Sequence, residues 1–234
     1  AALLSMGVPL APVMAFWLSS PLMDPSMFFL TAGTLGMKFA LFKTFSAVAV
    51  GILGGYGTYF LIGNGLITNP LREGIGSGGC GGSVIRNPKQ IIWKFWTEEE
   101  RKNHFFKSSV ENLIFLGKWM AIAFFLESLM LAYLPAEMVA HLVGDDGWGA
   151  VMLASVVGIP AYLNGYAALP LVAGLIEQGM APGAGMAFLL AGGVSCIPAA
   201  IAVLALARPP VFAAYLGFAF IGACVLGLSF GYII

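Results

Sequence analysis

The residues with the clearest potential to bind a solute lie where long apolar stretches of the chain are interrupted. The polar side chains at these interruptions are Ser19, Ser20, Asp24, Asn164, Ser195 and Cys196. The helix-breaking residues beside them are Pro21, Pro25, Pro160, Gly192, Gly193 and Pro198. A break in an apolar helix leaves backbone N–H and C=O groups unbonded, and lipid cannot satisfy them, so such backbone lines a cavity or is buried in protein. We therefore expect residues 19–25, 158–165 and 192–198 to meet in one polar cavity near the middle of a membrane.

Two interpretations of these polar residues stay open. In the first, they converge on a transported solute, and the Cys196 sulfur offers a soft ligand to a thiophilic metalloid. In the second, the polar groups cap helix ends around the prolines, and Cys196 packs as a small hydrophobic residue.

Glu127 lies in the middle of an expected membrane span. A carboxylate in hydrocarbon costs a few kcal/mol unless it faces the bundle interior, has a partner or is protonated. Lys118 in the same span is nine residues away, about 13 Å along a helix, which is too far for direct pairing. Glu127 is therefore either a proton relay that couples transport to the proton gradient or a neutral residue hydrogen-bonded to a neighbouring helix.

The composition is that of a membrane protein. Hydrophobic residues make up 59% of the 234 residues and charged residues 9%, whereas soluble domains carry about 25% charged residues. The sequence therefore predicts an all-α, polytopic membrane protein. A formal net charge of zero provides no basic surface for nucleic acid, and three widely spaced cysteines predict neither a zinc site nor a disulfide framework. We expect no metal centre and no cofactor.

Six apolar stretches are long enough to cross a bilayer, some of them with an internal break. They cover residues 7–37, 44–62, 110–134, 148–178, 183–207 and 211–232. Three parts follow: the end of a first repeat at 1–63 (two spans, the first broken), a loop at 64–108, and a second repeat at 109–234 (four spans, two broken). The loop holds seven of the eleven Lys and Arg residues, so we expect it to be cytoplasmic, with an interfacial helix. Lys38 and Lys43 are expected to extend their ammonium groups to the membrane interface.

The two halves of the chain share a pattern at a shift of 172 residues. The shift aligns Gly7, Met14 to Phe16, Leu18, Ala47 and Gly55 with Gly179, Met186 to Phe188, Leu190, Ala219 and Gly227. The second unit begins with two spans that have no counterpart in the first, so we expect about two spans to precede Ala1. Four spans per unit is an even number, which predicts that both units have the same orientation unless one broken segment is re-entrant.

At these positions the chain resembles the bacterial organoarsenical-permease family, the ArsP-type predicted permeases. The matching segments are 7–10, 19–25, 160–170, 178–182 and 186–198. The resemblance implies a protein of the bacterial inner membrane and, in some members, efflux of trivalent organoarsenicals. Family members often carry a Cys-x-Cys pair shortly before the segment that corresponds to residues 7–10. In the second repeat of this chain the equivalent positions are Asn164 and Tyr166, and in the first repeat they precede Ala1.

We therefore expect an integral membrane permease that resembles a secondary transporter and binds its solute between the two sets of broken helices. The sequence has no nucleotide-binding motif, so an ion gradient, such as protons, or a partner chain would supply the energy. A channel or a non-transporting membrane subunit would show the same breaks. An intramembrane enzyme is disfavoured, because His104 and His141 both lie outside the spans. The expected partners are the lipid bilayer and a small solute such as a trivalent organoarsenical, with no nucleic acid; a homo-oligomer stays compatible with the sequence.

Overall fold

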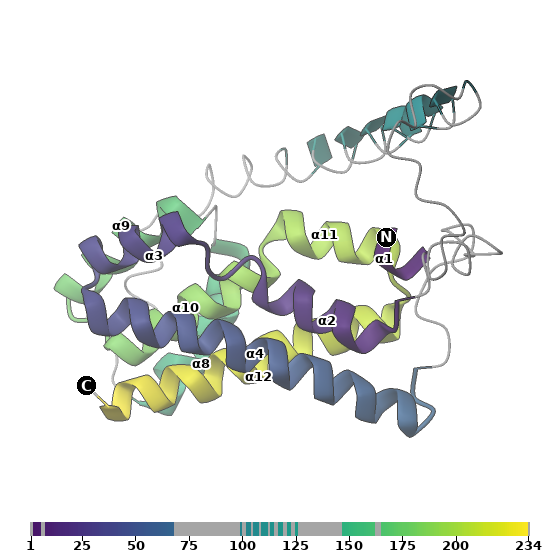
Figure 1. Ribbon diagram of the computed structural model, residues 1–234. Helices are drawn as coiled ribbons and strands as arrows, with labels where there is room; N and C mark the ends of the chain where they lie inside the picture. The colour runs from purple at the N-terminus through teal and green to yellow at the C-terminus, as the bar shows by residue number, and fades with distance from the viewer. Residues whose placement is uncertain are drawn as a thin grey trace.

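The computed structural model describes residues 2–5, 8–67, 147–161 and 165–233, together with separate positions between 99 and 125. Every regular element in these ranges is an α-helix, which confirms the all-α prediction (Figure 1). Among the described residues, two helices are each long and apolar enough to cross a membrane, and a pair of helices bent by 41° is a third candidate. Together with the composition, these helices identify a multi-pass membrane protein.

Three helices of the first half have counterparts in the second half. After a short α1 at Ala2–Ser5, α2 covers Leu10–Ser19, α3 covers Pro25–Thr34 and α4 covers Met37–Gly63. In the second half, α10 covers Pro182–Ser195, α11 covers Ile197–Leu206 and α12 covers Pro209–Ile233. Each helix of the second set begins 172 residues after its counterpart, so the shift in the sequence corresponds to a structural repeat.

Local residues account for the start of α3 and for the turn that follows it. The Asp24 side chain accepts the Met27 N–H, and Pro25 occupies the first turn of α3, where a missing amide donor costs nothing. Between α3 and α4, Gly36 has a φ of 91°, a left-handed conformation that glycine adopts without strain. The chain can therefore reverse direction between the broken helix pair and the long helix.

In both repeats the long helix packs against the helix before the break through a glycine. A Cβ added to Gly55 would lie 3.2 Å from the Ala15 Cβ, and one added to Gly227 would lie 2.6 Å from the Ala187 Cβ. The two pairs correspond under the 172-residue shift, so α2–α4 and α10–α12 form the same crossing. Small residues at such a crossing let two helix backbones approach closely inside a membrane.

The two repeats have opposite orientations, and the prediction of equal orientation is wrong. The long helices α4 and α12 lie side by side and antiparallel (Figure 1): Phe39, near the start of α4, packs against Phe230, near the end of α12, with ring centroids 4.9 Å apart. Midway along both helices, a Cβ on Gly222 would lie 2.9 Å from the Val50 side chain. Val50 and Gly222 correspond under the 172-residue shift. A pseudo-two-fold axis therefore passes between them, perpendicular to the spanning helices.

The reason lies in α8 (Trp148–Ala161) and α9 (Gly165–Glu177), which were expected to form one crossing. Trp148 and Pro182 line one hollow, and Glu177 and Pro182 line another, so the start of α8 and the end of α9 both lie beside the start of α10. The two helices therefore form a hairpin that enters and leaves at the same end of the bundle. A re-entrant segment removes one crossing and so inverts one repeat relative to the other.

The break in the second repeat falls later than predicted. Gly192 and Gly193 are buried residues inside α10, which continues to Ser195. Glycine keeps its backbone N–H and C=O, so it weakens a helix without removing a hydrogen bond. The backbone leaves the helical conformation only at Cys196, where ψ is 153°, two residues before Pro198.

The boundary between α8 and α9 falls within the predicted range 158–165, although Pro160 does not end α8. α8 continues through Pro160 to Ala161, α9 begins at Gly165, and residues 162–164 lie outside the described residues. A proline in the last turn removes one hydrogen bond only, so the helix ends just after it. Gly158 serves packing instead: a Cβ there would lie 2.7 Å from the Phe188 carbonyl oxygen of α10.

Candidate functional site

At the first break, polar residues at the start of α3 form hydrogen bonds that reach the start of α9. Asp24 Oδ1 accepts hydrogen bonds from the Met27 N–H at 2.7 Å and from the Ser26 hydroxyl at 2.6 Å. The Ser26 hydroxyl is also 2.9 Å from the Tyr166 hydroxyl, on α9. Asp24, Ser26 and Tyr166 are exposed, so a hydrogen-bonded series of polar groups links the first break to the re-entrant hairpin on an accessible face.

Lys43 lies under this first break, and the prediction that it extends to the membrane interface is wrong. Its side chain is fully buried in α4, at 0% exposure, because α4 turns this face toward the helices of both repeats. Its ammonium nitrogen has no hydrogen-bond partner among the described residues. Lys43 and Asp24 attract each other electrostatically, yet in the described structure they form no ion pair within 4.0 Å. Lys38, five residues earlier, is exposed as expected.

Ser46 adds a second buried polar group beside Lys43. It follows Lys43 by three residues, so both side chains lie on one face of α4. The Ser46 hydroxyl is fully buried and, within the described part of the chain, has no hydrogen-bond partner. Native proteins satisfy nearly all buried polar groups, so these two make this face of α4 a candidate site for a further polar group.

The second break is stabilised by a buried hydrogen bond. Pro198 has no N–H, so it cannot donate to the carbonyl of Val194, four residues earlier. The Tyr215 hydroxyl, from α12, donates to that carbonyl instead. Tyr215 is 1% exposed and also interacts electrostatically with Cys196, at the break itself. This arrangement satisfies a backbone group that lipid would leave unbonded.

The residues at the two breaks correspond under the repeat. Lys43 and Tyr215 are 172 residues apart, and so are Asp24 and Cys196. In each repeat, then, a buried side chain from the long helix lies near a polar residue in the break. The positions are related by the pseudo-two-fold axis, whereas the side chains differ: a cation and a carboxylate at one break, a phenol and a thiol at the other.

A cavity of about 250 Å³ connects the first break with α11 and Tyr215. Its lining residues are Phe16, Trp17, Ser20, Pro21, Ala199, Ala202, Val203, Leu206 and Tyr215. The cavity therefore lies between the first break and α11, the helix that follows the second break, and Tyr215 relates it to that break through its bond to Val194. Its walls are mainly apolar, with Ser20 as a polar side chain and Tyr215 as a residue whose hydroxyl is bonded to Val194, whereas a polar cavity was expected. The arrangement suits a small solute with an apolar group and a few hydrogen-bonding atoms.

The other predicted ligands have different positions. Ser19 and Ser195 both donate to carbonyl groups of their own helices, to Ala15 at 2.8 Å and to Ala191 at 2.6 Å. Cys196 lies next to the cavity through Tyr215 and is not in a disulfide. Asn164 and Glu127 lie outside the described residues, as do Cys80, His104 and His141. Among the described residues, no group of three or more His, Cys, Asp or Glu side chains is placed to hold a metal ion.

Lys43, Tyr166 and Tyr215 are site residues that the sequence analysis did not identify. The signal for Lys43 was present, since an ionisable residue within an apolar span is a functional candidate by default. The repeat offered the signal for Tyr215, because the 172-residue shift aligns it with Lys43. Nothing in the sequence pairs Tyr166 with Ser26, since that contact depends on the position of the hairpin.

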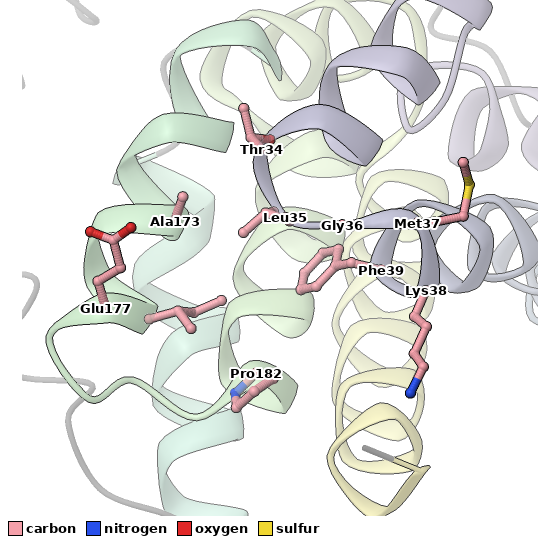
Figure 2. A pocket seen from close by; sticks show the side chains of 10 residues that line it. Thr34, Leu35, Gly36, Met37, Lys38, Phe39, Ala173, Glu177 and Pro182 are labelled. Atoms are coloured by element: carbon pink, nitrogen blue, oxygen red, sulfur yellow. The ribbon is translucent and has the colours of Figure 1, made fainter.

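A second hollow, of about 380 Å³, lies at one end of the bundle, where α3 turns into α4 and α9 leads to α10. Figure 2 shows its lining, with Glu177 on one side and Lys38 on the other. Thr34, Leu35 and Gly36 lie at its rim between these charges. This end of the bundle therefore presents a charged opening beside the re-entrant hairpin.

The sequence matches the ArsP_1 family, described as "Predicted permease", over residues 1–232. It is also 26% identical over 144 residues to the UPF0718 protein MJ0584 of Methanocaldococcus jannaschii. That match covers 62% of this chain and 40% of the relative, so the chain spans less than half of the relative's length. No solved structure matches the chain.

Proposed function

The chain belongs to the ArsP family of predicted permeases, and from this premise we propose that it is a secondary transporter that exports a small, largely apolar solute across the bacterial inner membrane. The permease binds the solute between its two breaks and exposes the site alternately to the two sides. Inverted repeats suit this mechanism, because exchanging the conformations of the two units converts an outward-open state into an inward-open one.

The observation that supports this proposal most directly is the cavity between the first break and α11. Its walls come from both repeats, with Ser20 and Pro21 on one side and Ala202 and Val203 on the other. Tyr215 lines it as well and bonds to the second break. A movement of one repeat relative to the other would therefore change the shape of the cavity and its access.

Trivalent organoarsenicals fit the chemistry of this cavity. Their organic group is apolar, as are most of the walls, and their arsenic bonds to soft sulfur ligands. The Cys196 thiol would supply the sulfur, since Cys196 interacts electrostatically with Tyr215, which lines the cavity, and is not in a disulfide. It would form an As–S bond reversibly, displacing one hydroxyl group of the arsenical, which leaves as water with the thiol proton.

Flux through the reconstituted full-length protein tests this function. Proteoliposomes are given phenylarsonous acid, a trivalent organoarsenical, and arsenic uptake is measured by mass spectrometry against concentration. Saturable uptake above that of empty liposomes is expected. Absence of uptake at every concentration would exclude this cargo, and uptake that never saturates would indicate a channel.

The role of Cys196 is tested by a matched pair of variants. Cys196→Ser should lower uptake by about tenfold, the effect of losing one interaction of about 1.4 kcal/mol. Cys224→Ser is the control, because this thiol lies in α12 and donates to the Ser155 hydroxyl at 3.4 Å, away from the cavity lining. Equal uptake by both variants would remove Cys196 from the binding site.

A further inference from the structure

We propose that Lys43 and Asp24 form the site that binds and releases the coupling proton of this transporter. The proposal rests on the proposed function, because it assumes coupled transport. Three observations place the site: the buried amine of Lys43, the carboxylate of Asp24 at the break, and the absence of an ion pair between them in the described structure. Glu127, which the sequence suggested for this role, lies outside the described residues.

The first step of the argument is the unsatisfied state of Lys43. Its ammonium nitrogen is fully buried and has no hydrogen-bond partner among the described residues. The free-energy cost of burying an unpaired ammonium group is removed when the group loses its proton and is reduced when it pairs with a carboxylate. Lysine is suited to such an exchange, whereas the guanidinium group of arginine stays charged.

The second step is the position of Asp24, the carboxylate that interacts with Lys43. It lies at the N-terminus of α3, exposed, with Ser26 and Met27 donating to it. It lies at the end of the non-helical residues between α2 and α3, and both of these helices pack on α4. Asp24 is therefore exposed at the surface of the bundle, while the amine with which it interacts electrostatically is buried.

The proton transfer balances between these two groups. When the break moves Asp24 toward α4, the Lys43 ammonium gives one proton to the carboxylate, leaving a neutral amine and a neutral carboxylic acid. When the break opens, Asp24 releases that proton to the accessible side. Lys43 is recharged by a proton when access changes to the other side, so one proton crosses per cycle.

No other described ionisable group competes for this role. The helices packed against α4 are α2, α3, α10 and α12, and neither α2, α3 nor α10 contains an ionisable side chain beyond the Asp24 cap. α12 contributes Tyr215, Cys224 and Tyr232, none of which acts electrostatically on Lys43, whereas Asp24 does. The counterpart of Lys43 is Tyr215, whose proton is used in the bond to Val194.

A spectroscopic experiment tests the site without any cargo. The full-length protein is labelled with ¹⁵N at the lysine Nζ atoms, and the signal absent from Lys43→Met identifies Lys43. We expect this signal to change with pH and its midpoint to move in Asp24→Asn, a substitution that keeps a capping side chain. A Lys43 signal with the same pH dependence in both proteins would overturn the proposal.

Transport measurements provide the second test. With phenylarsonous acid as the probe, Lys43→Met and Asp24→Asn should reduce uptake driven by a pH gradient by at least about tenfold, while exchange at equal concentrations on both sides stays within about twofold. Lys38→Met, an exposed control on the same helix, should change neither. Gradient-driven uptake that survives in Lys43→Met would overturn the proposal. If the unaltered protein moves no arsenical, the proposed cargo fails, and the nitrogen signals still decide the proton site.

Discussion

The two helix breaks occupy equivalent positions and differ in chemistry. The first carries Asp24, exposed at the start of α3, over the buried ammonium of Lys43, which has no partner among the described residues. The second carries Cys196 beside Tyr215, whose hydroxyl satisfies the Val194 carbonyl. The repeat thus determines where each break lies, and the side chains determine its chemistry. A hydrogen bond stabilises the second break, whereas the first break has two opposite charges that can pair.

The largest difference between the repeats should come from their helix crossings. Gly227→Ala should destabilise the protein by about 1–3 kcal/mol, the usual cost of overpacking, because the new Cβ would lie 2.6 Å from the Ala187 Cβ and 2.8 Å from the Gly183 carbonyl oxygen. Gly55→Ala should cost less than about 1 kcal/mol, since its nearest contact is 3.2 Å. Thermal unfolding in detergent measures both, and equal losses would mean that the two crossings are equally tight.

The second prediction removes the hydrogen bond at the second break. Tyr215→Phe should cost about 1–3 kcal/mol, because the buried Val194 carbonyl loses its donor. Tyr232→Phe is the control, since Tyr232 is 79% exposed, and it should have little effect. Unfolding midpoints that fall equally in the two variants would contradict the assigned role of Tyr215.

A double-variant cycle sharpens this prediction. Pro198→Ala restores an N–H two residues after Cys196, at the position from which a helical amide would reach the Val194 carbonyl. In that background Tyr215→Phe should cost less than it does alone, with an interaction energy of about 0.5–3 kcal/mol between the two sites. Additive losses would show that the tyrosine and the proline act independently.

The third prediction compares the caps of the two breaks. Asp24→Ala should destabilise the protein by about 1 kcal/mol, and Asp24→Asn by much less, because asparagine also accepts the Met27 N–H. Cys196→Ala should change stability by less than about 0.5 kcal/mol, because no side-chain hydrogen bond caps α11. Denaturation curves for the three variants test the order, and a Cys196→Ala loss as large as that of Asp24→Ala would be inconsistent with it.

The smallest effect is expected at the charged opening in Figure 2. Glu177→Gln and Lys38→Met alter exposed charges that form no ion pair with each other within 4.0 Å in the described structure, so the unfolding free energy should stay within about 0.5 kcal/mol. A larger loss of unfolding free energy in either variant would show that the charges at this opening, and not those at the breaks, contribute to the stability of the bundle.

Much of the local structure could be predicted from the residues. Asp24 followed by Pro25 indicated where α3 begins, and the 172-residue shift correctly related the starts of three helix pairs. The positions of Gly192 and Gly193 misled the prediction, since glycine permits a break but does not require one. Tertiary packing decided whether the helix breaks there, because every residue of α10 after Pro182 is buried and the helix continues to Ser195.

By itself, the sequence determined the helices, their repeat and the membrane environment, because hydrophobic length, capping and backbone chemistry act over a few neighbouring residues. Only the tertiary structure decided the relative orientation of the repeats, since that depends on whether the α8–α9 segment crosses the membrane or returns. It also decided the burial of Lys43 and the pairing of Tyr215 with Val194. The burial of a side chain depends on the helices that pack against it, and here those helices come from distant parts of the sequence.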